Sequence, residues 1–515
     1  MTARYDIFEL ALSGREDGNP FVDVQLEARF FQRNRVLTVP GFYDGDGRYV
    51  VRFSPDAEGE WEYYTVSDDA ALDGISGSFF CGPAEGLHGP VRVKDTFHFA
   101  HADGTAFFPF GTTAYNWVNQ PDAVRMDTWK TLSDAPFNKV RMSPFPKHYI
   151  YNLDEPPMYP YVGGLLPGKE EAARAAEPFG QVGSECYSFD FSRPNVYFWQ
   201  YMDGVLLRMR DMGIECDFIL FHPYDRWGFS TMPRENRLQY VRYMVARYAA
   251  YSNIWWSLAN EWDIFREWAE DDWEAVAAEI VRWDWANHLR SIHNCRQFYD
   301  YGRGWITHAS IQRIDYHMHV SLTDEWRKKW RKPVVIDEVC YEGDLDAGFG
   351  NIPGEEMLRR FWETCVRGGY CTHGETFLHE NDVIWWGKGG TLSGTSPARI
   401  GFLRKIMEES PGAWDMGASE WDLPFANAGK RFIATQTTHF GSFQREYAEY
   451  MICYFGYAQP RDRTFHLPQG HKYTVDIIDT WNMTVMPVEG IFEGSAYVKL
   501  CSRPYIAVRF REVSA

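Results

Sequence analysis

Short apolar runs alternate with longer helix-like stretches between residues 91 and 411, and this alternation constrains the fold more than any other feature. Eight strands that alternate with helices over about 320 residues are what a (β/α)8 barrel requires. The predicted strands are 107–112, 139–142, 217–221, 254–259, 297–299, 314–317, 334–337 and 370–373. The predicted helices include 195–212, 235–251, 271–293 and 354–367. We therefore predict an α/β protein built around a TIM barrel.

The segments on either side of this region have a different pattern. Residues 1–90 show apolar and polar residues in alternation, for example at 22–28 and 49–53, between turn-rich sequences. Strand-like runs at 431–436, 473–479 and 505–510 follow the last helical pattern. We expect an N-terminal immunoglobulin-like β-sandwich at 1–90, a catalytic barrel at 91–411 and a C-terminal β-sandwich at 412–515.

Composition restricts the partners and the compartment. The net charge of −19 argues against nucleic acid or an anionic membrane as a partner. No apolar run approaches the length that spans a bilayer, and the first residues lack the apolar core of a signal peptide. Nine cysteines without a CxxC pattern indicate reduced thiols rather than a disulfide framework. We expect a cytoplasmic protein that needs no cofactor and no metal, and the sequence leaves open whether it forms a homo-oligomer.

Two predicted strands end in acidic residues. Asn260 and Glu261 follow the strand at 254–259, and Glu338 follows the strand at 334–337. A lone glutamate at such a place would be explained by the dipole of the next helix. Strands four and seven of a barrel, however, bring both carboxyl groups to the same open face. Two facing carboxyls are the minimum required for glycoside hydrolysis, in which one protonates the leaving oxygen and the other traps the sugar.

The motifs around these residues resemble those of the retaining glycoside hydrolases of clan A. The sequences that carry the resemblance are WSLANEWD at 256–263, RSIHN at 290–294 and DEVCYEG at 337–343. They are similar to a branch of β-glycosidases with an N-terminal β-sandwich of unknown function and apiosidase-like relatives. The resemblance implies that Glu261 is the acid/base, that Glu338 is the nucleophile and that Asn260 binds the sugar 2-hydroxyl. It also implies that Arg141 keeps the nucleophile ionised, the alternative being a surface ion pair.

Further candidates for substrate binding lie at the ends of other predicted strands and in the loops beyond them. They are Tyr115, Asn116, His222, His319, Glu375, Trp385 and Trp386. Each could touch the sugar or could support a neighbouring side chain, and the two tryptophans could stack on sugar or pack their loop on the barrel. The clan often has Tyr on strand six and Trp on strand eight, where this chain has YHMH at 316–319 and THGE at 372–375. The resemblance therefore does not transfer the substrate.

Two long loops, 143–193 and 374–397, should rise on the catalytic face. Walls of this kind favour a pocket over an open groove, so we expect an exo-acting enzyme on oligosaccharides or glycosides. The alternative is that these loops brace the sandwiches or another subunit. A retaining double displacement predicts carboxyl groups about 5–5.5 Å apart. Two other functions stay open, namely a metal-dependent barrel hydrolase that uses His222, His317, His319 and His373, and an inactive carbohydrate-binding protein.

Overall fold

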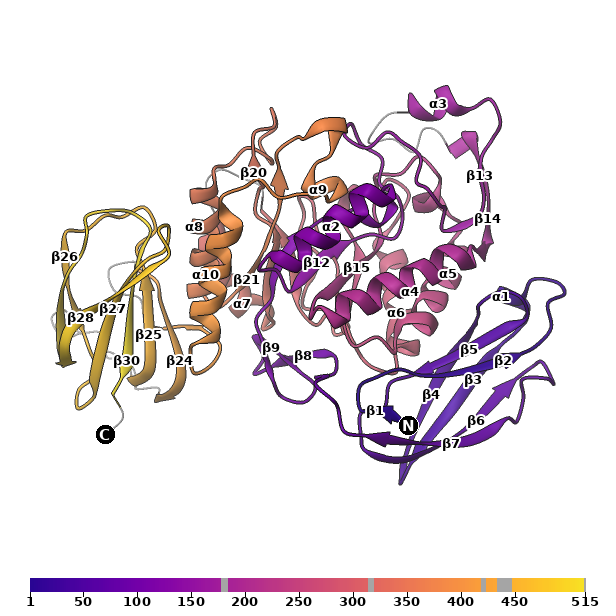
Figure 1. Ribbon diagram of the computed structural model, residues 1–515, viewed down its shortest axis with the longest axis horizontal. Coiled ribbons are helices and arrows are strands. Elements are labelled where there is room, and N and C mark those ends of the chain that lie inside the picture. Colours follow the sequence, from indigo (N-terminus) through magenta and orange to yellow (C-terminus); the bar gives the residue numbers. More distant parts are fainter. Residues whose placement is uncertain (177–183, 314–318, 418–422, 433–446, 514–515) are drawn as a thin grey trace.

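A closed barrel of eight parallel strands forms the centre of the computed structural model, which describes residues 1–176, 184–313, 319–417, 423–432 and 447–513 (Figure 1). The strands lie in the order β17-β16-β15-β12-β11-β21-β19-β18. A parallel bridge between His293 and Ser310 joins the two ends of this sheet. The predicted TIM barrel is thereby confirmed. Its strands are β11 (Phe110–Thr113), β12 (Lys139–Met142), β15 (Glu215–Phe221), β16 (Ile254–Ala259), β17 (Leu289–Ser291), β18 (Ala309–Gln312), β19 (Val334–Glu338) and β21 (Tyr370–His373).

Helices pack around the outside of the barrel and bury one apolar face each. In α8, for example, Leu358, Phe361 and Trp362 are completely buried, while Glu355 is partly exposed. The surrounding helices are α2 (Asp122–Asp134), α4 (Val196–Asp211), α5 (Arg234–Tyr248), α6 (Glu270–Trp283), α7 (Thr323–Trp330), α8 (Gly354–Val366) and α10 (Ser396–Glu408).

The predicted fifth barrel strand at 297–299 is wrong. The fifth strand is β17, which falls inside the stretch predicted as a helix at 271–293, because α6 ends at Trp283. Only three residues form β17, and two of them, Arg290 and Ser291, are polar, so no apolar run marks it. The predicted sixth strand, 314–317, lies outside the described residues, and the barrel instead uses β18 at Ala309–Gln312.

The predicted first strand at 107–112 divides into two. Ala106–Phe107 form β10, which belongs to a three-stranded antiparallel sheet with β8 (Val91–Lys94) and β9 (His98–His101). The barrel strand β11 begins only after Pro109. The rings of Phe99 and Phe107 lie 5.2 and 6.1 Å from that of Trp255, so this small sheet packs against the first half of β16.

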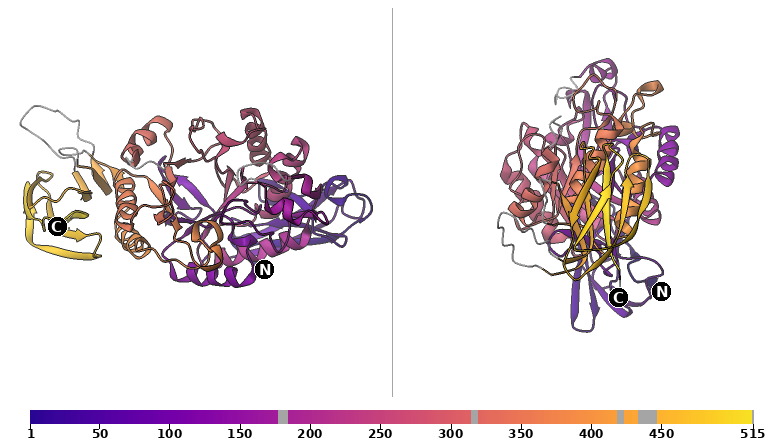
Figure 2. Two further views of the ribbon diagram at one scale, coloured as in Figure 1. Left: turned by 90° about the horizontal axis from the view of Figure 1, so that it is seen from above. Right: turned by 90° about the vertical axis from the view of Figure 1, so that its left-hand side faces the viewer.

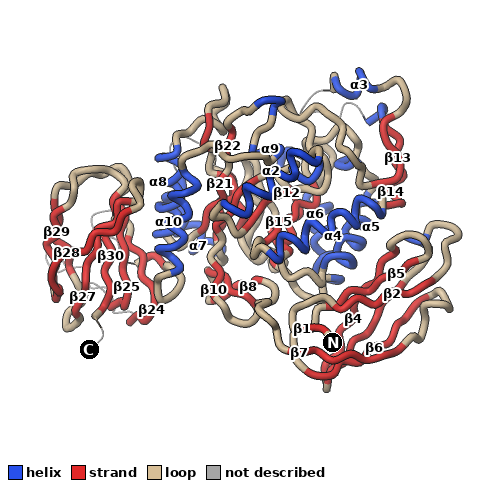
Figure 3. The backbone as a smooth tube through the Cα atoms, viewed as in Figure 1, coloured by secondary structure: helices blue, strands red, loops and turns tan. Residues whose placement is uncertain are grey.

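Regions built mainly of strands lie on opposite sides of the barrel, and the N-terminal one also contains the short helix α1 (Pro20–Asp23) (Figures 2 and 3). The N-terminal sheet has the order β1-β7-β6-β3-β4-β5-β2. Its strand β4 passes between two layers, since Arg35–Pro40 pair with β3 and Gly41–Tyr43 pair with β5. Phe30 and Phe53 stack between the layers with ring centroids 4.2 Å apart. The strands are β1 (Thr2–Ala3), β2 (Phe8–Ser13), β3 (Leu26–Gln32), β4 (Arg35–Tyr43), β5 (Arg48–Phe53), β6 (Gly59–Ser67) and β7 (Ser76–Gly82).

The C-terminal region is an eight-stranded antiparallel sheet around its own apolar core, which includes Met451, Phe465 and Phe510. Trp362 of α8 stacks on Tyr454 of β25 at 5.3 Å and so joins this sheet to the barrel. The run predicted at 431–436 extends past the end of β24 into residues that the structure does not describe. The strands are β23 (Asp415–Met416), β24 (Phe425–Phe432), β25 (Tyr447–Tyr454), β26 (Asp462–His466), β27 (Lys472–Asp479), β28 (Thr484–Glu493), β29 (Ser495–Lys499) and β30 (Ile506–Glu512).

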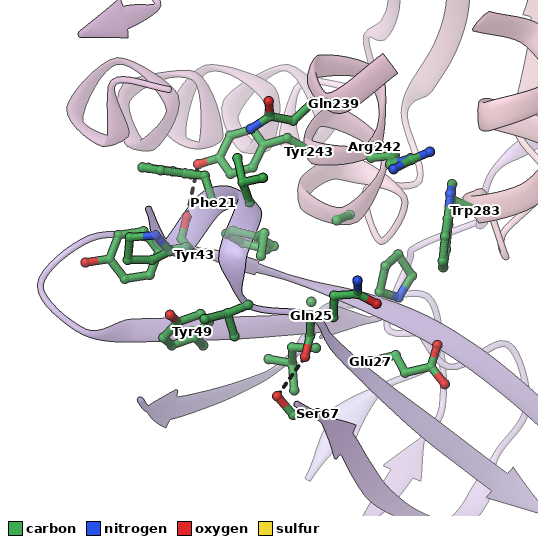
Figure 4. Close-up of a pocket in the computed structure, with 18 of the residues that line it drawn as sticks. Phe21, Gln25, Glu27, Tyr43, Tyr49, Ser67, Gln239, Arg242, Tyr243 and Trp283 are labelled. Carbon is green, nitrogen blue, oxygen red and sulfur yellow. Dashed lines mark hydrogen bonds between the residues drawn. The ribbon is translucent and has the colours of Figure 1, made fainter. Parts of the chain in front are cut away.

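A hollow of about 1070 Å³ separates the N-terminal sheet from the outer side of the barrel helices (Figure 4). Tyr43 and Gln25 line it from the sheet, and Gln239 and Trp283 line it from α5 and α6. At the edge of the hollow, the Tyr243 hydroxyl donates a hydrogen bond to the carbonyl of Tyr43 at 3.2 Å. The hollow is thus bounded by both parts of the chain and lies outside the barrel.

Candidate active site

Glu261 and Glu338 lie at the carboxyl ends of β16 and β19, where the barrel opens. Glu338 is the last residue of β19, and Glu261 is the second residue after β16. The backbone of Glu261 is left-handed, with φ 56° and ψ 55°. This conformation is uncommon for a residue other than glycine and costs on the order of 1–3 kcal/mol, so the surrounding structure must hold it in place. Both side chains are buried, and each is at most 6% exposed.

The surroundings of Glu338 favour its ionised form. The Tyr115 hydroxyl donates a hydrogen bond to Oε1, and Nε2 of His293 lies 3.2 Å from the same oxygen. Burial alone would raise the pKa of Glu338. The hydrogen bond from His293, attraction to His293 and Arg141, and the hydrogen bond from Tyr115 outweigh burial and lower the pKa to about 2. These contacts therefore favour the negatively charged carboxylate.

The surroundings of Glu261 favour its protonated form instead. Burial raises the pKa of Glu261, and the nearby charge of Glu338 raises it further. Lys147 and the hydrogen bond from the Tyr224 hydroxyl act in the opposite direction, but the net shift is upward. The Asn260 amide also lies 3.3 Å from Oε2. A buried carboxyl group that keeps its proton can serve as a general acid.

Arg141 supports the site without touching the nucleophile. Its Nη2 donates to Oδ1 of Asn260 at 3.1 Å, and the oxygen of the Tyr115 hydroxyl lies 2.9 Å from the same atom. The guanidinium is fully buried, which contradicts a surface ion pair. Its ion pairs are with Asp217 and Asp337, both at 3.3 Å. The expected effect of Arg141 on Glu338 is therefore electrostatic and acts over a distance.

A network of four buried charges lies beneath these residues. Lys139 approaches Asp217 at 2.8 Å and Asp337 at 2.5 Å, and Arg141 contacts the same two carboxylates. Two cations thus balance two anions inside the barrel. Because the four side chains come from β12, β15 and β19, the network fixes these strands relative to one another directly below the carboxyl groups.

Tyr115 and Trp386 are the other predicted substrate-binding residues that the structure brings to the carboxyl pair. Their rings lie edge to face with centroids 6.3 Å apart. Tyr149 lies 5.1 Å from Trp386, which connects the loop after β12 to the loop after β21. Gly387 is required at this contact, because a Cβ there would lie 2.0 Å from the Tyr149 hydroxyl.

Three predicted site residues have other contacts in the structure. Trp385 is fully buried and donates its indole N–H to Thr112 at 2.8 Å, so it packs its loop on the barrel. The Asn116 amide oxygen accepts the backbone N–H of Lys147 at 3.0 Å and thus supports the loop after β12. Glu375 accepts the backbone N–H groups of Ser393 and Gly394 and holds the loop before α10.

For the two histidines predicted to bind substrate, His222 and His319, the structure gives less information about contact with a sugar. Nε2 of His222 lies 3.2 Å from the carbonyl of Phe145, and burial lowers the pKa of this histidine to about 3, so the ring is neutral. Its Nδ1 is buried and has no hydrogen-bond partner among the described residues. His319 is the first residue of a short 3-10 helix (His319–Leu322), and its side chain lies outside what the structure describes.

Sequence reasoning missed four of the residues that contact or surround the carboxyl pair. They are Lys147, Tyr224, His293 and Tyr341. Signals for three of them were present, since Tyr224 follows the third barrel strand, and His293 and Tyr341 lie within the motifs RSIHN and DEVCYEG. Tyr341 packs so closely against Gly374 that a Cβ at that glycine would lie 2.0 Å from the tyrosine ring.

Lys147 carries the unexpected positive charge of the site. Burial lowers the pKa of Lys147 to about 8, although Glu261 and Glu338 act in the opposite direction. The amine is therefore mostly protonated at neutral pH. No sequence pattern marks this lysine, because it lies within a long loop.

Neither a metal site nor a membrane-spanning helix is found among the described residues. Among them, no group of three or more His, Cys, Asp or Glu side chains is arranged to hold a metal ion. None of the described helices is long and apolar enough to cross a membrane.

Comparison with known proteins identifies the family. Residues 94–420 match the model of the apiosidase-like catalytic domain. Residues 1–68 and 437–511 match two domains of unknown function, DUF5060 and DUF5605. No curated protein matches the chain.

Solved structures give the same assignment. A candidate glycoside hydrolase from Bacteroides vulgatus ATCC 8482 is 35% identical, with 99% of each chain covered and a TM-score of 0.89. A family 5 glycoside hydrolase from the same organism is 16% identical over 82% of this chain and 94% of its own, with a TM-score of 0.58, and shows similarity of fold alone. The chain therefore belongs to the apiosidase-like family and is a glycoside hydrolase.

Proposed function

We propose that the protein is a retaining, exo-acting glycosidase that cleaves O-glycosidic bonds of oligosaccharides or glycosides, with Glu338 as nucleophile and Glu261 as acid/base. The observation that carries this proposal is geometric: the two carboxyls lie at the carboxyl ends of β16 and β19, with His293 and Tyr115 against Glu338 and the Tyr224 hydroxyl against Glu261. The directions of the two pKa shifts agree with it. Burial and the charge of Glu338 raise the pKa of Glu261, whereas His293, Arg141 and Tyr115 overcome burial and lower the pKa of Glu338 to about 2. One protonated and one ionised carboxyl are what the first step of a double displacement needs.

The reaction then proceeds in two steps. In the first, Glu338 attacks the anomeric carbon, the bond from that carbon to the leaving oxygen breaks, and Glu261 gives its proton to that oxygen. In the second, Glu261 takes a proton from water, the water oxygen bonds to the anomeric carbon, and the ester bond to Glu338 breaks. Asn260, which Arg141 and Tyr115 orient through its Oδ1, can donate from its amide nitrogen to the 2-hydroxyl of the sugar.

Contact between the two loops supports exo action. The loop after β12 supplies Lys147 and Tyr149, and the segment after β21 supplies Trp386 from α9 (Trp385–Lys388). Because Tyr149 and Trp386 meet beside Tyr115, they form a wall on one side of the carboxyl pair. A wall of this kind favours binding of a chain end over binding of the middle of a polymer.

The proposal also assigns domains to the regions on either side of the barrel. We assign residues 1–90 to an N-terminal sandwich, 91–411 to the catalytic barrel and 412–515 to a C-terminal sandwich. This division is supported by the two matches to domains of unknown function on either side of the catalytic match. It agrees with a branch of β-glycosidases that carries an N-terminal β-sandwich.

A nucleophile test decides the central assignment. A panel of nitrophenyl glycosides first identifies a sugar that the enzyme accepts, and Glu338→Ala is then assayed on that substrate. We expect no turnover, with partial rescue by azide that yields a glycosyl azide of inverted anomeric configuration. Near-wild-type activity of Glu338→Ala, or a first product of inverted configuration from the wild-type enzyme by NMR, would show that the assignment is wrong.

A further inference from the structure

Lys147 places its ammonium group inside a cage of aromatic rings. Nζ lies 3.6 Å from the ring centroid of Tyr115 and 4.2 Å from that of Tyr224. The rings of Trp386 and Tyr149 follow at 5.7 and 5.8 Å. Ring faces attract cations, and the residue is only 2% exposed. The cage therefore stabilises the positive charge of a side chain that is almost completely buried.

This ammonium group has no direct anionic partner. Within the part of the chain that the structure describes, Nζ forms neither an ion pair nor a hydrogen bond. Buried lysines are nearly always paired, because removing a charge from water is costly. The position of Lys147 thus requires an explanation beyond packing.

The two nearest rings connect the lysine to both carboxyl groups. Tyr115 donates its hydroxyl to Glu338, and Tyr224 donates its hydroxyl to Glu261. Both carboxyls also attract the ammonium electrostatically. We propose that Lys147 is the shared counter-ion of the two carboxyl groups and stabilises whichever of them is ionised at each stage of the reaction. This inference rests on the roles proposed above for Glu261 and Glu338.

The charge balance of the reaction explains why such a cation should be unpaired. Glu338 carries the negative charge before the first step, and Glu261 carries it once Glu338 has become an ester and the proton has left with the alcohol. In the second step the proton from water returns the charge to Glu338. A cation in direct contact with one carboxylate would hold the charge there. A cation between the two favours both states.

The other groups near Glu261 and Glu338 are not placed to stabilise the negative charge on both carboxyls in turn. Arg141 is already neutralised by Asp217 and Asp337. His293 contacts only Glu338 of the two carboxyls. The remaining titratable groups that face Lys147 or the carboxyls are Tyr115 after β11, Tyr149 in the loop after β12, His222 and Tyr224 after β15, Cys295 after β17 and Tyr341 after β19.

The pH dependence of kcat/KM tests the proposal. Lys147→Met removes the charge with little change in length, and Lys147→Arg keeps the charge. Loss of a nearby cation makes both carboxyls harder to ionise, so in Lys147→Met both limbs of the profile should move to higher pH, by about one unit. Lys147→Arg should leave both limbs close to those of the wild type. As a matched control, Lys388→Met removes a buried lysine whose charged neighbours are Asp154 and Asp382, and should shift neither limb.

Three results would overturn the proposal. Unchanged limbs with a raised KM in Lys147→Met would make Lys147 a substrate-binding residue instead. Equal shifts in the Met and Arg variants would show that the charge is not responsible. If Lys147→Met does not fold by circular dichroism, Lys147→Gln replaces it, and unshifted limbs in that variant would equally contradict the proposal. Failure of the catalytic assignment itself would appear in Glu338→Ala, with Lys147 intact.

Discussion

Nε2 of His293 lies 3.2 Å from Oε1 of Glu338, and Nδ1 of the same ring lies 3.0 Å from the Ser310 hydroxyl. One imidazole from the end of β17 thus connects the proposed nucleophile to the neighbouring strand β18. The hydrogen bond to Glu338 is the largest of the effects that lower the pKa of that carboxyl against burial.

Replacement of this histidine should raise the acid limit of activity. Glu338 must be ionised to react, and the hydrogen bond from His293 lowers its pKa, so the wild type should stay active to a lower pH than a variant without this histidine. A hydrogen bond to a charged group contributes about 1.5–3 kcal/mol, which corresponds to roughly one to two pH units. In His293→Phe the acid limb of kcat/KM should rise by that amount. His101→Phe serves as the control, since His101 belongs to the small antiparallel sheet and its Nδ1 faces the Gly89 carbonyl, and an equal shift in both variants would rule out a specific effect.

Loss of the acid/base should depend on the leaving group. In Glu261→Ala, glycosides with poor leaving groups should react about 10²–10⁴-fold more slowly, because their departing oxygen needs a proton. Dinitrophenyl glycosides need little protonation and should keep a nearly normal first step, visible as a rapid burst of phenolate. A uniform loss across leaving groups would remove Glu261 from this role.

Product size should reveal a pocket. Lys147, Tyr149 and Trp386 bring two loops together beside the carboxyl pair, so one sugar at a time should leave from the end of the substrate. Chromatography of the early products from a hexasaccharide of the accepted linkage checks this. Fragments of intermediate length that appear before any monosaccharide would indicate an open cleft.

The adjacent tryptophans Trp385 and Trp386 should behave differently. Trp385 is fully buried, so Trp385→Ala should lower the free energy of unfolding by about 3–5 kcal/mol, measured by denaturant titration. Trp386 is partly exposed and lies beside Tyr115, so Trp386→Ala should mainly raise KM, with a smaller loss of stability. The reverse pattern would place the sugar against Trp385.

Long apolar strands were predictable from the sequence because burial on both faces leaves a continuous run. β16, for example, has the predicted limits. β17 was not predictable, because a strand of three residues that ends in Arg290 and Ser291 resembles the end of the preceding helix. The strand predicted at 107–112 was not predictable in detail either. One apolar run, interrupted by Pro109, supplies β10 to the small antiparallel sheet and β11 to the barrel.

Some residues of the candidate active site could likewise be predicted from the sequence, and others could not. The two carboxyls could be predicted because strand ends in a barrel converge on one face. Glu375 was assigned to the same face by that rule, but its carboxylate is taken up by backbone N–H groups of the following loop. Lys147 could not be found, since its role depends on rings from three other segments that only the tertiary structure brings together.

The join between β17 and β18 gives the barrel wall a particular vulnerability. In the described part of the wall a single bridge, between His293 and Ser310, pairs these strands, whereas the neighbouring strands pair over several residues. Hydrogen bonds from Thr307 to the Arg290 carbonyl and from Ser291 to the His308 carbonyl support the seam below this bridge. Local opening at this seam would remove the hydrogen-bond partner of the nucleophile before it disturbed the rest of the fold. On heating or in mild denaturant, catalytic activity should therefore disappear while most of the protein is still native.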